Sequence, residues 1–339
     1  VVSISYVGYT TIDTLISFNN SKVRLKLIMH LTSTTLQPIE LYDSRQEGLV
    51  YDRLKSIEGV AIYAAKKNEV IDMDRITANT SGNNARQVFA RVPGVNVWES
   101  DCAGLQLGVG ARGLSPDRTA NFNTRQNGYD MAADALGYPE SYYTPPTEAI
   151  EKIQVVRGAA SLQYGTQFGG MVNFIPKKGN PNKKLELETR QTFGSFNFIN
   201  SFNSIGGEVK NLNYYAYFQH KKGDGWRPNS EFIQNAGFAN LNYKVTNRLK
   251  IGVNVTIMEY TAKQPGGLTD KQFEIDPQTS SRERNWFKVG WNLGAITADY
   301  NLTENTKINS ITYGLLASRF ALGTLDPINR QDANGLRNL

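Results

Sequence analysis

The C-terminal half of the chain repeats one pattern, in which apolar and polar residues alternate along segments of about ten residues. In residues 249–257, LKIGVNVTI, every odd-numbered residue is Leu, Ile or Val, and the even-numbered residues are Lys, Gly, Asn and Thr. Residues 185–193 and 238–245 alternate in the same way. Successive side chains of a strand point to opposite faces, and a tilted strand of about ten residues can cross a bilayer. The pattern therefore predicts amphipathic antiparallel strands, either in a transmembrane β-barrel or in a soluble sandwich.

The connections between these segments favour the barrel. Turn-like stretches alternate with long polar loops; the turns lie at residues 209–212, 246–248 and 303–305, and the loops near residues 221–234 and 261–284. Short turns at one rim and long loops at the other are typical of outer-membrane barrels. The polar face carries few charges, as a wet lumen requires, and the segments exceed the ~5–6 residues of a common strand. Tyr260, Trp286 and Tyr300 at strand ends suit interfacial girdles.

Composition and motifs exclude several classes of protein. No apolar run approaches the ~20 residues of a membrane helix. The net charge is +6, but Lys and Arg are scattered, so we expect no nucleic-acid partner. Cys102 is the only cysteine, which excludes an intrachain disulfide and a cysteine zinc site. His30 and His220 lie far apart, without an HExxH or GxSxG motif, so we predict no enzyme, no catalytic residue, no bound metal and no cofactor.

The first 180 residues have a different organisation. Residues 1–43 hold short β-branched runs and one alternating stretch at 23–31, with His30 on its polar side. Residue 1 is Val and no signal-peptide pattern follows, so we expect any export signal to be missing from this chain. Residues 44–75 are interpreted as a polar linker with a short apolar run, GVAIY. Residues 76–180 predict a compact α/β module, in which Asn84 caps a helix over 85–92.

Two glycine-containing motifs in this module have structural interpretations. Residues 108–113, GVGARG, match GxGxxG, but a turn follows instead of the helix that a dinucleotide site needs, so we expect close backbone packing. Residues 148–175 predict two strands of a central sheet, at 153–156 and 171–175. The glycines between or beside them would let the chain turn tightly; they are Gly158, Gly165, Gly169 and Gly170.

The long loop at residues 115–144 is the part of the module most suggestive of binding. Arginine offers a fixed fork of donors to a carboxylate or phosphate, and the alternative is a plain solvated loop. The candidate ligand-binding residues here are Arg118, Arg125, Gln126, Asn127 and Tyr129.

Taken together, the chain resembles the TonB-dependent outer-membrane receptors from about residue 56 to its end. Three pieces carry the resemblance: ARQVFARVPGVNV (85–97), GARG (110–113) with QNG (126–128), and residues 150–174 with their VRG, YG, GG and VNF. Asn127 stands where many relatives carry Asp. Within the family, the loop DRTANFNTRQNGYDMAADALGYPESYYTPP is similar to the ferric-dicitrate receptor subgroup of Bacteroidetes type.

The resemblance implies an α+β plug domain at 76–180, followed by an antiparallel transmembrane β-barrel whose N-terminal strands occupy 181–339. Residues 1–43 resemble the end of a carboxypeptidase-regulatory-like module, a short β-sandwich remnant. Family barrels have roughly twenty-two strands and about seven can be placed here, so we expect an incomplete barrel and a chain that is a fragment. The implied location is the outer membrane of a Gram-negative cell.

The implied function is import of a ferric chelate, iron(III) dicitrate or a carboxylate siderophore, energised by the protein TonB. Another nutrient, such as an oligosaccharide or cobalamin, and a secreted β-rich binding protein or adhesin are the alternatives. The expected partners are TonB, the chelate and outer-membrane lipid. TonB would pair by strand addition with a TonB box, here predicted at Glu58, Gly59, Val60, Ala61, Ile62 and Tyr63. The plug would contact the barrel through Arg112, Glu151 and Arg157, with Glu186, Glu188 or Arg190 as candidate partners.

Overall fold

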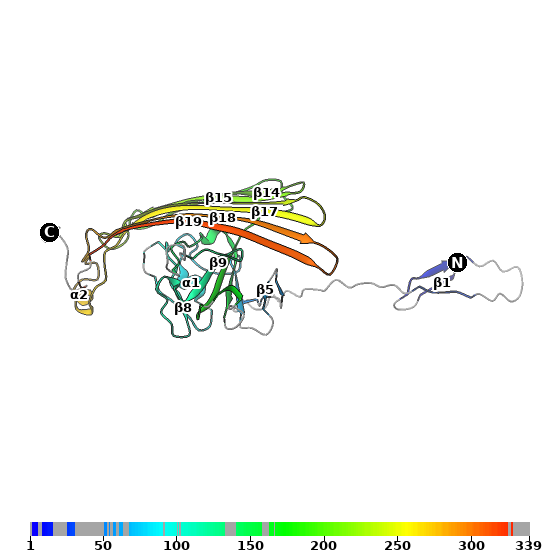
Figure 1. Cartoon of the computed structure of the whole chain (residues 1–339), viewed down its shortest axis with the longest axis horizontal. Coiled ribbons are helices and arrows are strands. Elements are labelled where there is room, and N and C mark those ends of the chain that lie inside the picture. The colour runs from blue at the N-terminus through cyan, green and yellow to red at the C-terminus, as the bar shows by residue number, and fades with distance from the viewer. Residues whose placement is uncertain are drawn as a thin grey trace, which may run out of the picture. The chain divides into compact units, whose positions relative to one another are not determined.

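The computed structural model describes residues 2–5, 9–15, 26–30, 51–52, 54, 57–58, 61–63, 68–90, 92–99, 101, 103–132, 140–157, 163–165, 167–324 and 327. The chain forms two compact units, Val1–Leu49 and Val50–Leu339 (Figure 1). In the first unit, β1 (Val2–Ile4) pairs antiparallel with β2 (Ile12–Thr14). Residues 26–30, predicted as part of a strand, are not in one, although the Thr10 amide donates to the His30 carbonyl at 2.9 Å. His30 is exposed, as predicted.

The predicted plug domain, called the plug below, folds around a six-stranded mixed sheet with the order β10-β9-β12-β11-β6-β3. Its strands are β3 (Tyr51–Asp52), β6 (Asn68–Asp72), β9 (Phe122–Gln126), β10 (Tyr129–Asp130), β11 (Ile150–Val156) and β12 (Gly170–Pro176). β11 and β12 pair antiparallel, which confirms the two central strands predicted from the sequence. β12 also pairs with β9, in parallel. Alternate residues of both central strands, such as Ile153 and Phe174, enter the core.

The plug sheet begins before the predicted boundary at residue 76. β6 pairs with β11, which sets Ile71 opposite Ile153, and β3 pairs with β6. Ile71 and Val70 are both buried, in two separate core clusters. The segment predicted as linker therefore supplies strands to the plug. A strand of five residues, NEVID, between polar flanks carries too short an alternation to be recognised without its partner.

The helix of the plug is short and capped as predicted. α1 runs over Ala85–Phe89, and the side chain of Asn84 accepts a hydrogen bond from the Gln87 amide at 2.8 Å. Val88 and Phe89 are its buried residues. The helix thus ends earlier than the predicted residue 92, because Pro93 disfavours helical backbone at the residue before it.

The motif GVGARG lies partly on a strand, as expected for close backbone packing. β7 (Val95–Val97) pairs antiparallel with β8 (Val109–Ala111). A Cβ on Gly110 would lie 2.5 Å from the Leu114 carbonyl oxygen, so only glycine fits there. Arg112 follows in an exposed turn with a φ of 60°.

The C-terminal sheet is a seven-stranded antiparallel meander in sequence order. Its strands are β13 (Glu186–Phe193), β14 (Ile199–Val209), β15 (Leu212–Gly223), β16 (Phe232–Lys244), β17 (Leu249–Lys263), β18 (Trp286–Asn301) and β19 (Lys307–Leu322). Short turns at 210–211, 245–248 and 302–306 alternate with longer loops at 224–231 and 264–285, as the sequence predicts. The second loop contains the helix α2 (Asp270–Ile275). No helix in the described ranges is long and apolar enough to cross a membrane.

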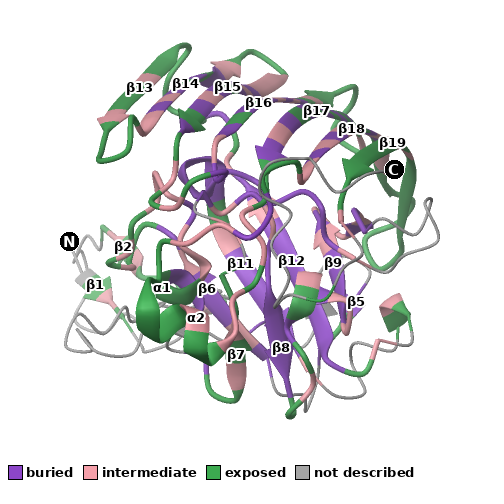
Figure 2. Ribbon diagram, turned by 90° about the vertical axis from the view of Figure 1, so that its left-hand side faces the viewer, coloured by how far each residue is buried: buried purple, intermediate pink, exposed green. Residues whose placement is uncertain are grey.

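The plug covers one face of the C-terminal sheet, and that face is the polar one (Figures 1 and 2). On β17, Thr256 is 0% exposed, whereas its neighbour Ile257 on the other face is 59% exposed. We call the face toward the plug the inner face and the other the outer face. A soluble sandwich would bury the apolar face instead, so this arrangement fits a wall whose outer face meets lipid.

Apolar residues also reach the inner face from several strands, among them Phe202 of β14 and Phe238 of β16, and they prevail on β18. Its buried inner residues include Val289, Trp291 and Leu293, while Asn292 is exposed on the outer face. The plug surface opposite β18 therefore meets apolar side chains, which the alternation of residues alone does not reveal.

Candidate functional site

The inner face of the C-terminal sheet is joined to the plug by side-chain hydrogen bonds. Gln126, at the end of β9, donates to the Thr256 hydroxyl at 3.0 Å and to the Tyr129 hydroxyl at 2.9 Å. Gln106 donates to the Tyr260 hydroxyl at 3.0 Å, so Tyr260 faces the plug and does not join the interfacial girdle that the sequence predicted. All of these groups but Gln106 are buried, so each bond satisfies a polar atom that would otherwise lose water without compensation.

Tyrosines extend the same interface. Tyr129 stacks on Tyr313 of β19 with ring centroids 5.9 Å apart, and burial raises the pKa of Tyr129 to about 12. The Tyr143 and Tyr217 hydroxyls lie 3.3 Å apart. These rings therefore fill the space between plug and sheet as neutral, hydrogen-bonding groups.

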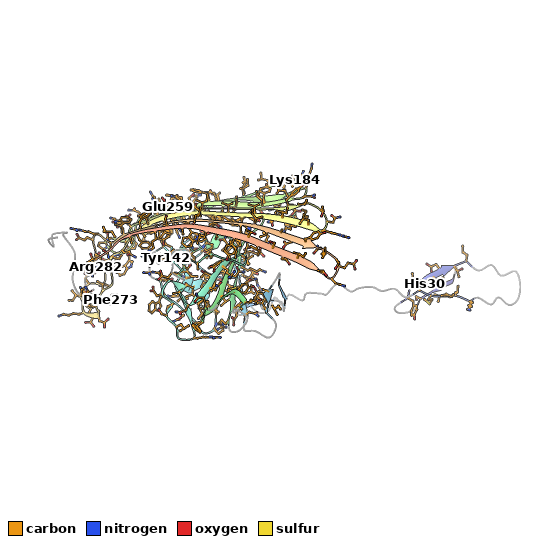
Figure 3. The ribbon with its side chains drawn as sticks, viewed as in Figure 1. His30, Tyr142, Lys184, Glu259, Phe273 and Arg282 are labelled. Carbon is orange, nitrogen blue, oxygen red and sulfur yellow. The ribbon has the colours of Figure 1, made fainter. Side chains whose placement is uncertain are left out.

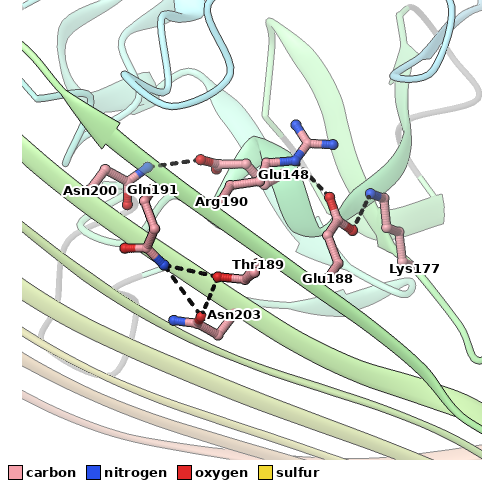
Figure 4. Close-up of polar contacts among 8 residues, drawn as sticks. All are labelled: Glu148, Lys177, Glu188, Thr189, Arg190, Gln191, Asn200 and Asn203. Atoms are coloured by element: carbon pink, nitrogen blue, oxygen red, sulfur yellow. Dashed lines mark hydrogen bonds and ion pairs between the residues drawn. The ribbon is translucent and has the colours of Figure 1, made fainter.

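Two buried charged side chains also cross the interface. Lys221 of β15 is fully buried and donates to the Ala103 carbonyl of the plug at 2.6 Å. Glu148 lies in the 3-10 turn η3 (Thr147–Ala149) and accepts from Asn200 of β14 at 2.8 Å (Figure 4). Burial raises the pKa of Glu148, although the charge of Lys221 opposes that rise. Sequence reasoning missed both residues, because a lysine on the polar face of a strand looks like ordinary lumen lining and a glutamate in a turn looks like a surface residue.

An arginine-rich cluster lies on the plug beside β19. Arg118 donates from Nη1 to both carboxylate oxygens of Glu140, at 3.1 Å each. The Tyr142 hydroxyl donates to the same carboxylate, and Arg319 of β19 lies 5.3 Å from the Tyr142 ring centroid. Figure 3 shows Tyr142 on the plug side of the sheet. Burial followed by the bond to Glu140 raises the pKa of Tyr142 to about 12.

This cluster, Arg118, Glu140, Tyr142 and Arg319, combines two guanidinium groups with one carboxylate. One positive charge is therefore not balanced within it. Guanidinium groups bind carboxylates and phosphates through paired N–H donors, so the cluster is suited to an anionic ligand. Sequence reasoning found Arg118 but missed Arg319, which lies about 200 positions further on in an alternating strand.

The structure does not bring the other predicted ligand-binding residues to Arg118. Arg125 donates to Asn123 at 2.6 Å, to the Gly128 carbonyl at 2.6 Å and to the Tyr164 carbonyl at 2.9 Å, and it lies over the Tyr164 ring. Gln126 and Tyr129 bond at the interface described above, and Asn127 donates to Asn254 of β17 at 3.4 Å. These four side chains make contacts that hold the plug together or join it to the sheet, and a role in ligand binding stays a prediction.

The predicted TonB box is attached to the plug. β4 (Ile57–Glu58) pairs with β5 (Ala61–Ile62), while Gly59 and Val60 lie outside the described residues. The Gln163 side chain bonds both the amide and the carbonyl of Ile62, at 3.1 Å each. The Tyr63 and Tyr164 hydroxyls lie 2.8 Å apart, and Tyr63 is buried in the smaller core cluster.

The predicted plug–barrel charge contacts are placed differently. Arg157 pairs with Glu69 of β6 and donates to the Pro93 carbonyl, so its contacts lie within the plug. Glu151 is exposed on β11, as is Arg112 in its turn. The reason is that β6 pairs with β11 and brings Glu69 to the end of that strand.

Two of the predicted barrel partners, Glu188 and Arg190, contact residues other than Glu151 and Arg157. Glu188 lies 3.5 Å from Lys177 of the plug, and Arg190 donates to Glu188 at 2.6 Å (Figure 4). Lys177 follows β12 directly, so this ion pair joins the end of the plug sheet to the first strand of the C-terminal sheet. Within the described ranges, no group of three or more His, Cys, Asp and Glu side chains could hold a metal ion.

Residues 61–172 match the family described as TonB-dependent Receptor Plug Domain. The Ferrienterobactin receptor of Escherichia coli is 27% identical over 199 residues, which cover 49% of this chain and 26% of that receptor. The Probable TonB-dependent siderophore receptor PirA of Acinetobacter baumannii is 31% identical over 160 residues, or 41% of this chain and 21% of that protein. The chain thus spans about a quarter of the length of these curated relatives.

Solved receptor structures share the fold. The ferric citrate transporter FecA in its unliganded form is similar with a TM-score of 0.63 and 22% identity, over 76% of this chain and 40% of FecA. The siderophore receptor PiuA from Acinetobacter baumannii is similar with a TM-score of 0.58 and 15% identity, over 76% of this chain and 37% of PiuA. The predicted fold is confirmed: a plug domain precedes an antiparallel sheet that is part of a barrel, and the barrel is not closed in this chain. These related proteins are named as receptors or, for FecA, as a transporter.

Proposed function

Because residues 61–172 form a TonB-dependent receptor plug domain and the strands after it match receptor barrels, we propose that the chain is part of an outer-membrane receptor. This receptor imports a ferric chelate with energy supplied through TonB. The observation that carries the proposal is the seating of the plug on the polar face of a sheet whose outer face is apolar and exposed. Such a wall suits lipid outside and a plugged polar lumen inside.

The ligand that we propose is iron(III) dicitrate or a carboxylate siderophore. Support comes from the cluster of Arg118, Glu140, Tyr142 and Arg319. In this cluster Arg118 already donates hydrogen bonds to a carboxylate, that of Glu140. A carboxylate of the chelate can take the place of Glu140 and retain the same hydrogen bonds. The relative from Escherichia coli is named for ferric enterobactin, whereas FecA is named for ferric citrate, so the two chelates are the first candidates to compare.

The coupling site that we propose is the segment from Glu58 to Tyr63. Within this segment, β5 pairs with β4 and Ile62 bonds the Gln163 side chain, which supports an extended backbone that can exchange one strand partner for another. TonB would then add a strand to this segment from the periplasmic side.

The experiment is uptake of radioactive iron by cells in which the receptor with its complete barrel is the only one present. We expect uptake of ferric dicitrate that requires TonB and that falls at least tenfold in an Arg118→Gln, Arg319→Gln double variant, since a charged hydrogen bond contributes about 1.5–3 kcal/mol. Arg284→Gln, at an exposed arginine outside the cluster, controls for the loss of a positive charge from the receptor in itself. Uptake of iron from ferric enterobactin in preference to ferric dicitrate would reject the proposed ligand, and so would uptake of labelled cobalamin or oligosaccharide by the same cells without uptake of iron.

A second pair of variants tests the coupling segment. Ile62→Pro removes the backbone amide that a new strand partner needs, whereas Ile62→Ala keeps it. We expect the first to abolish uptake while chelate binding persists, and the second to transport normally. Recovery of the complete protein as a soluble secreted species would reject the receptor function itself.

A further inference from the structure

A hollow of about 690 Å³ lies where strands β13 to β17 reach the long-loop end of the C-terminal sheet. The hairpin at residues 194–198 forms one side and the ends of β15, β16 and β17 form the other. The Asp224 amide donates to the Phe196 carbonyl at 2.8 Å, and the Gly194 amide donates to the Phe198 carbonyl at 2.9 Å. Backbone hydrogen bonds therefore fix the shape of the hollow.

The floor of the hollow is apolar and belongs to the outer face. Phe193 pairs with Ile199, Ile199 with Lys222, and Lys222 with Ile233, so the four residues form one row across the strands. Phe193 is 74% exposed and Ile233 is 46% exposed. The hollow thus offers uncovered apolar surface on the side of the sheet away from the plug.

A lysine is set into this apolar row. Lys222 is exposed between Ile199 and Ile233, and no ion pair among the described residues involves it. By contrast, Lys263 at the rim of the hollow lies 3.5 Å from Glu231. Two carboxylates also line the hollow, and each has a partner of its own: Glu231 pairs with Lys263, and Asp224 accepts from the Asn197 side chain at 2.5 Å. The positive charge of Lys222 is therefore available to an anion that enters the hollow.

The position of the hollow along the strands indicates its depth relative to the membrane. One row closer to the short turns, the outer face is polar or glycine in every strand, at Gln191, Ser201, His220, Asn235, Glu259, Gly290 and Ser318. Beyond that polar row lies the exposed aliphatic wall, with Ile205 and Val255 among its residues. If the wall meets hydrocarbon, the hollow lies at the level of the lipid headgroups on the side of the long loops.

We propose that this hollow binds a membrane lipid with a phosphorylated headgroup. The phosphate would contact Lys222, and the part of the lipid next to its headgroup would cover Phe193, Ile199 and Ile233. The volume suits one small-molecule ligand rather than a protein surface. An apolar floor that faces outward favours a lipid over free phosphate, which would gain nothing from it. Lysine at this level keeps its methylene chain on apolar surface and its ammonium group among headgroups.

The test is native mass spectrometry of the receptor with its complete barrel in detergent, titrated with diphosphoryl lipid A and, separately, with an uncharged galactosyl diacylglycerol. We expect one lipid A molecule to bind tightly, and Lys222→Glu to weaken that binding about tenfold without affecting the uncharged lipid. Lys307→Glu, an exposed lysine at the opposite end of the sheet, should bind lipid A as the wild type does.

A second variant separates the apolar and charged parts of the site. Ile233→Asn should weaken lipid A binding while it leaves the charge of Lys222 in place, and heat-modifiable electrophoretic mobility checks that both variants are folded. Equal binding of lipid A by wild type and Lys222→Glu would overturn the proposal. Displacement of lipid A by millimolar inorganic phosphate would overturn it too, because the hollow would then be a simple anion site. The lipid site does not depend on which chelate the receptor imports.

Discussion

Glu148 offers a sharp test of how plug and sheet are held together. Its carboxylate is 2% exposed, and only Oε1 has a hydrogen-bond partner, Asn200, while Oε2 is buried without one. Burial raises the pKa of Glu148 more than the charge of Lys221 and the bonded groups lower it. Ionised Glu148 therefore destabilises the folded state. The Glu148→Gln variant has a neutral side chain of the same shape and should be more stable than the wild type at neutral pH.

The size and pH dependence of the effect follow from linkage. Ionisation of the buried carboxyl is what costs free energy, and a pKa difference of one unit between the folded and unfolded states corresponds to about 1.4 kcal/mol, so we expect Glu148→Gln to raise the free energy of unfolding by roughly 1 kcal/mol at pH 8. Because folding raises the pKa, the stability contributed by the wild-type carboxyl is fully present below its unfolded pKa of about 4.3 and is lost as pH rises through the folded pKa. The advantage of glutamine should thus be smallest near pH 4 and grow toward pH 8.

The assay is calorimetry of the complete receptor in detergent from pH 4 to pH 8, in which 1 kcal/mol corresponds to a shift in Tm of a few degrees. Glu148→Ala should lower Tm at every pH, since it deprives Asn200 of an acceptor and leaves a cavity. Glu151→Gln, an exposed carboxylate on the adjoining strand, is the matched control and should change little. If Glu148→Gln lowered Tm at pH 8 as much as Glu148→Ala does, attraction to Lys221 would outweigh burial and the reasoning would be wrong.

Three further perturbations test other parts of the fold. Gly170→Ala should destabilise the plug by about 3 kcal/mol or more in denaturant titration, because φ is +125° and a Cβ would lie 2.4 Å from the Val156 carbonyl; normal stability would refute the close approach. Gln126→Leu should cost about 1–3 kcal/mol of plug stability by the same measurement, since it leaves the Thr256 hydroxyl without its donor, and an unchanged midpoint would argue against that contact. Tyr63→Phe should speed hydrogen exchange around residues 61–63, because it removes the contact with the Tyr164 hydroxyl, and an unchanged rate would show that the contact does not restrain the segment.

Much of the fold was determined by local sequence. The alternation in residues 249–257 predicted a long strand with one apolar and one polar face, and β17 has both. Asn84 predicted its helix cap, and the two apolar runs around the glycines of residues 158–170 predicted the central strands. These features are local because a period of two or a capping side chain depends only on neighbours in the chain.

The tertiary structure alone decided which side chains meet. Arg157 pairs with Glu69 because β6 joins the plug sheet, and Arg118 shares a cluster with Arg319 because β19 lies beside the plug. β18 turns Trp291 inward and Asn292 outward, against the rule of its neighbour β17. Periodicity gives the direction of a side chain relative to its own strand, whereas the surface that it meets depends on segments remote in sequence. The alternating sequence therefore predicted the strands of the sheet and their two faces, but it did not predict the contacts that hold the plug against the inner face.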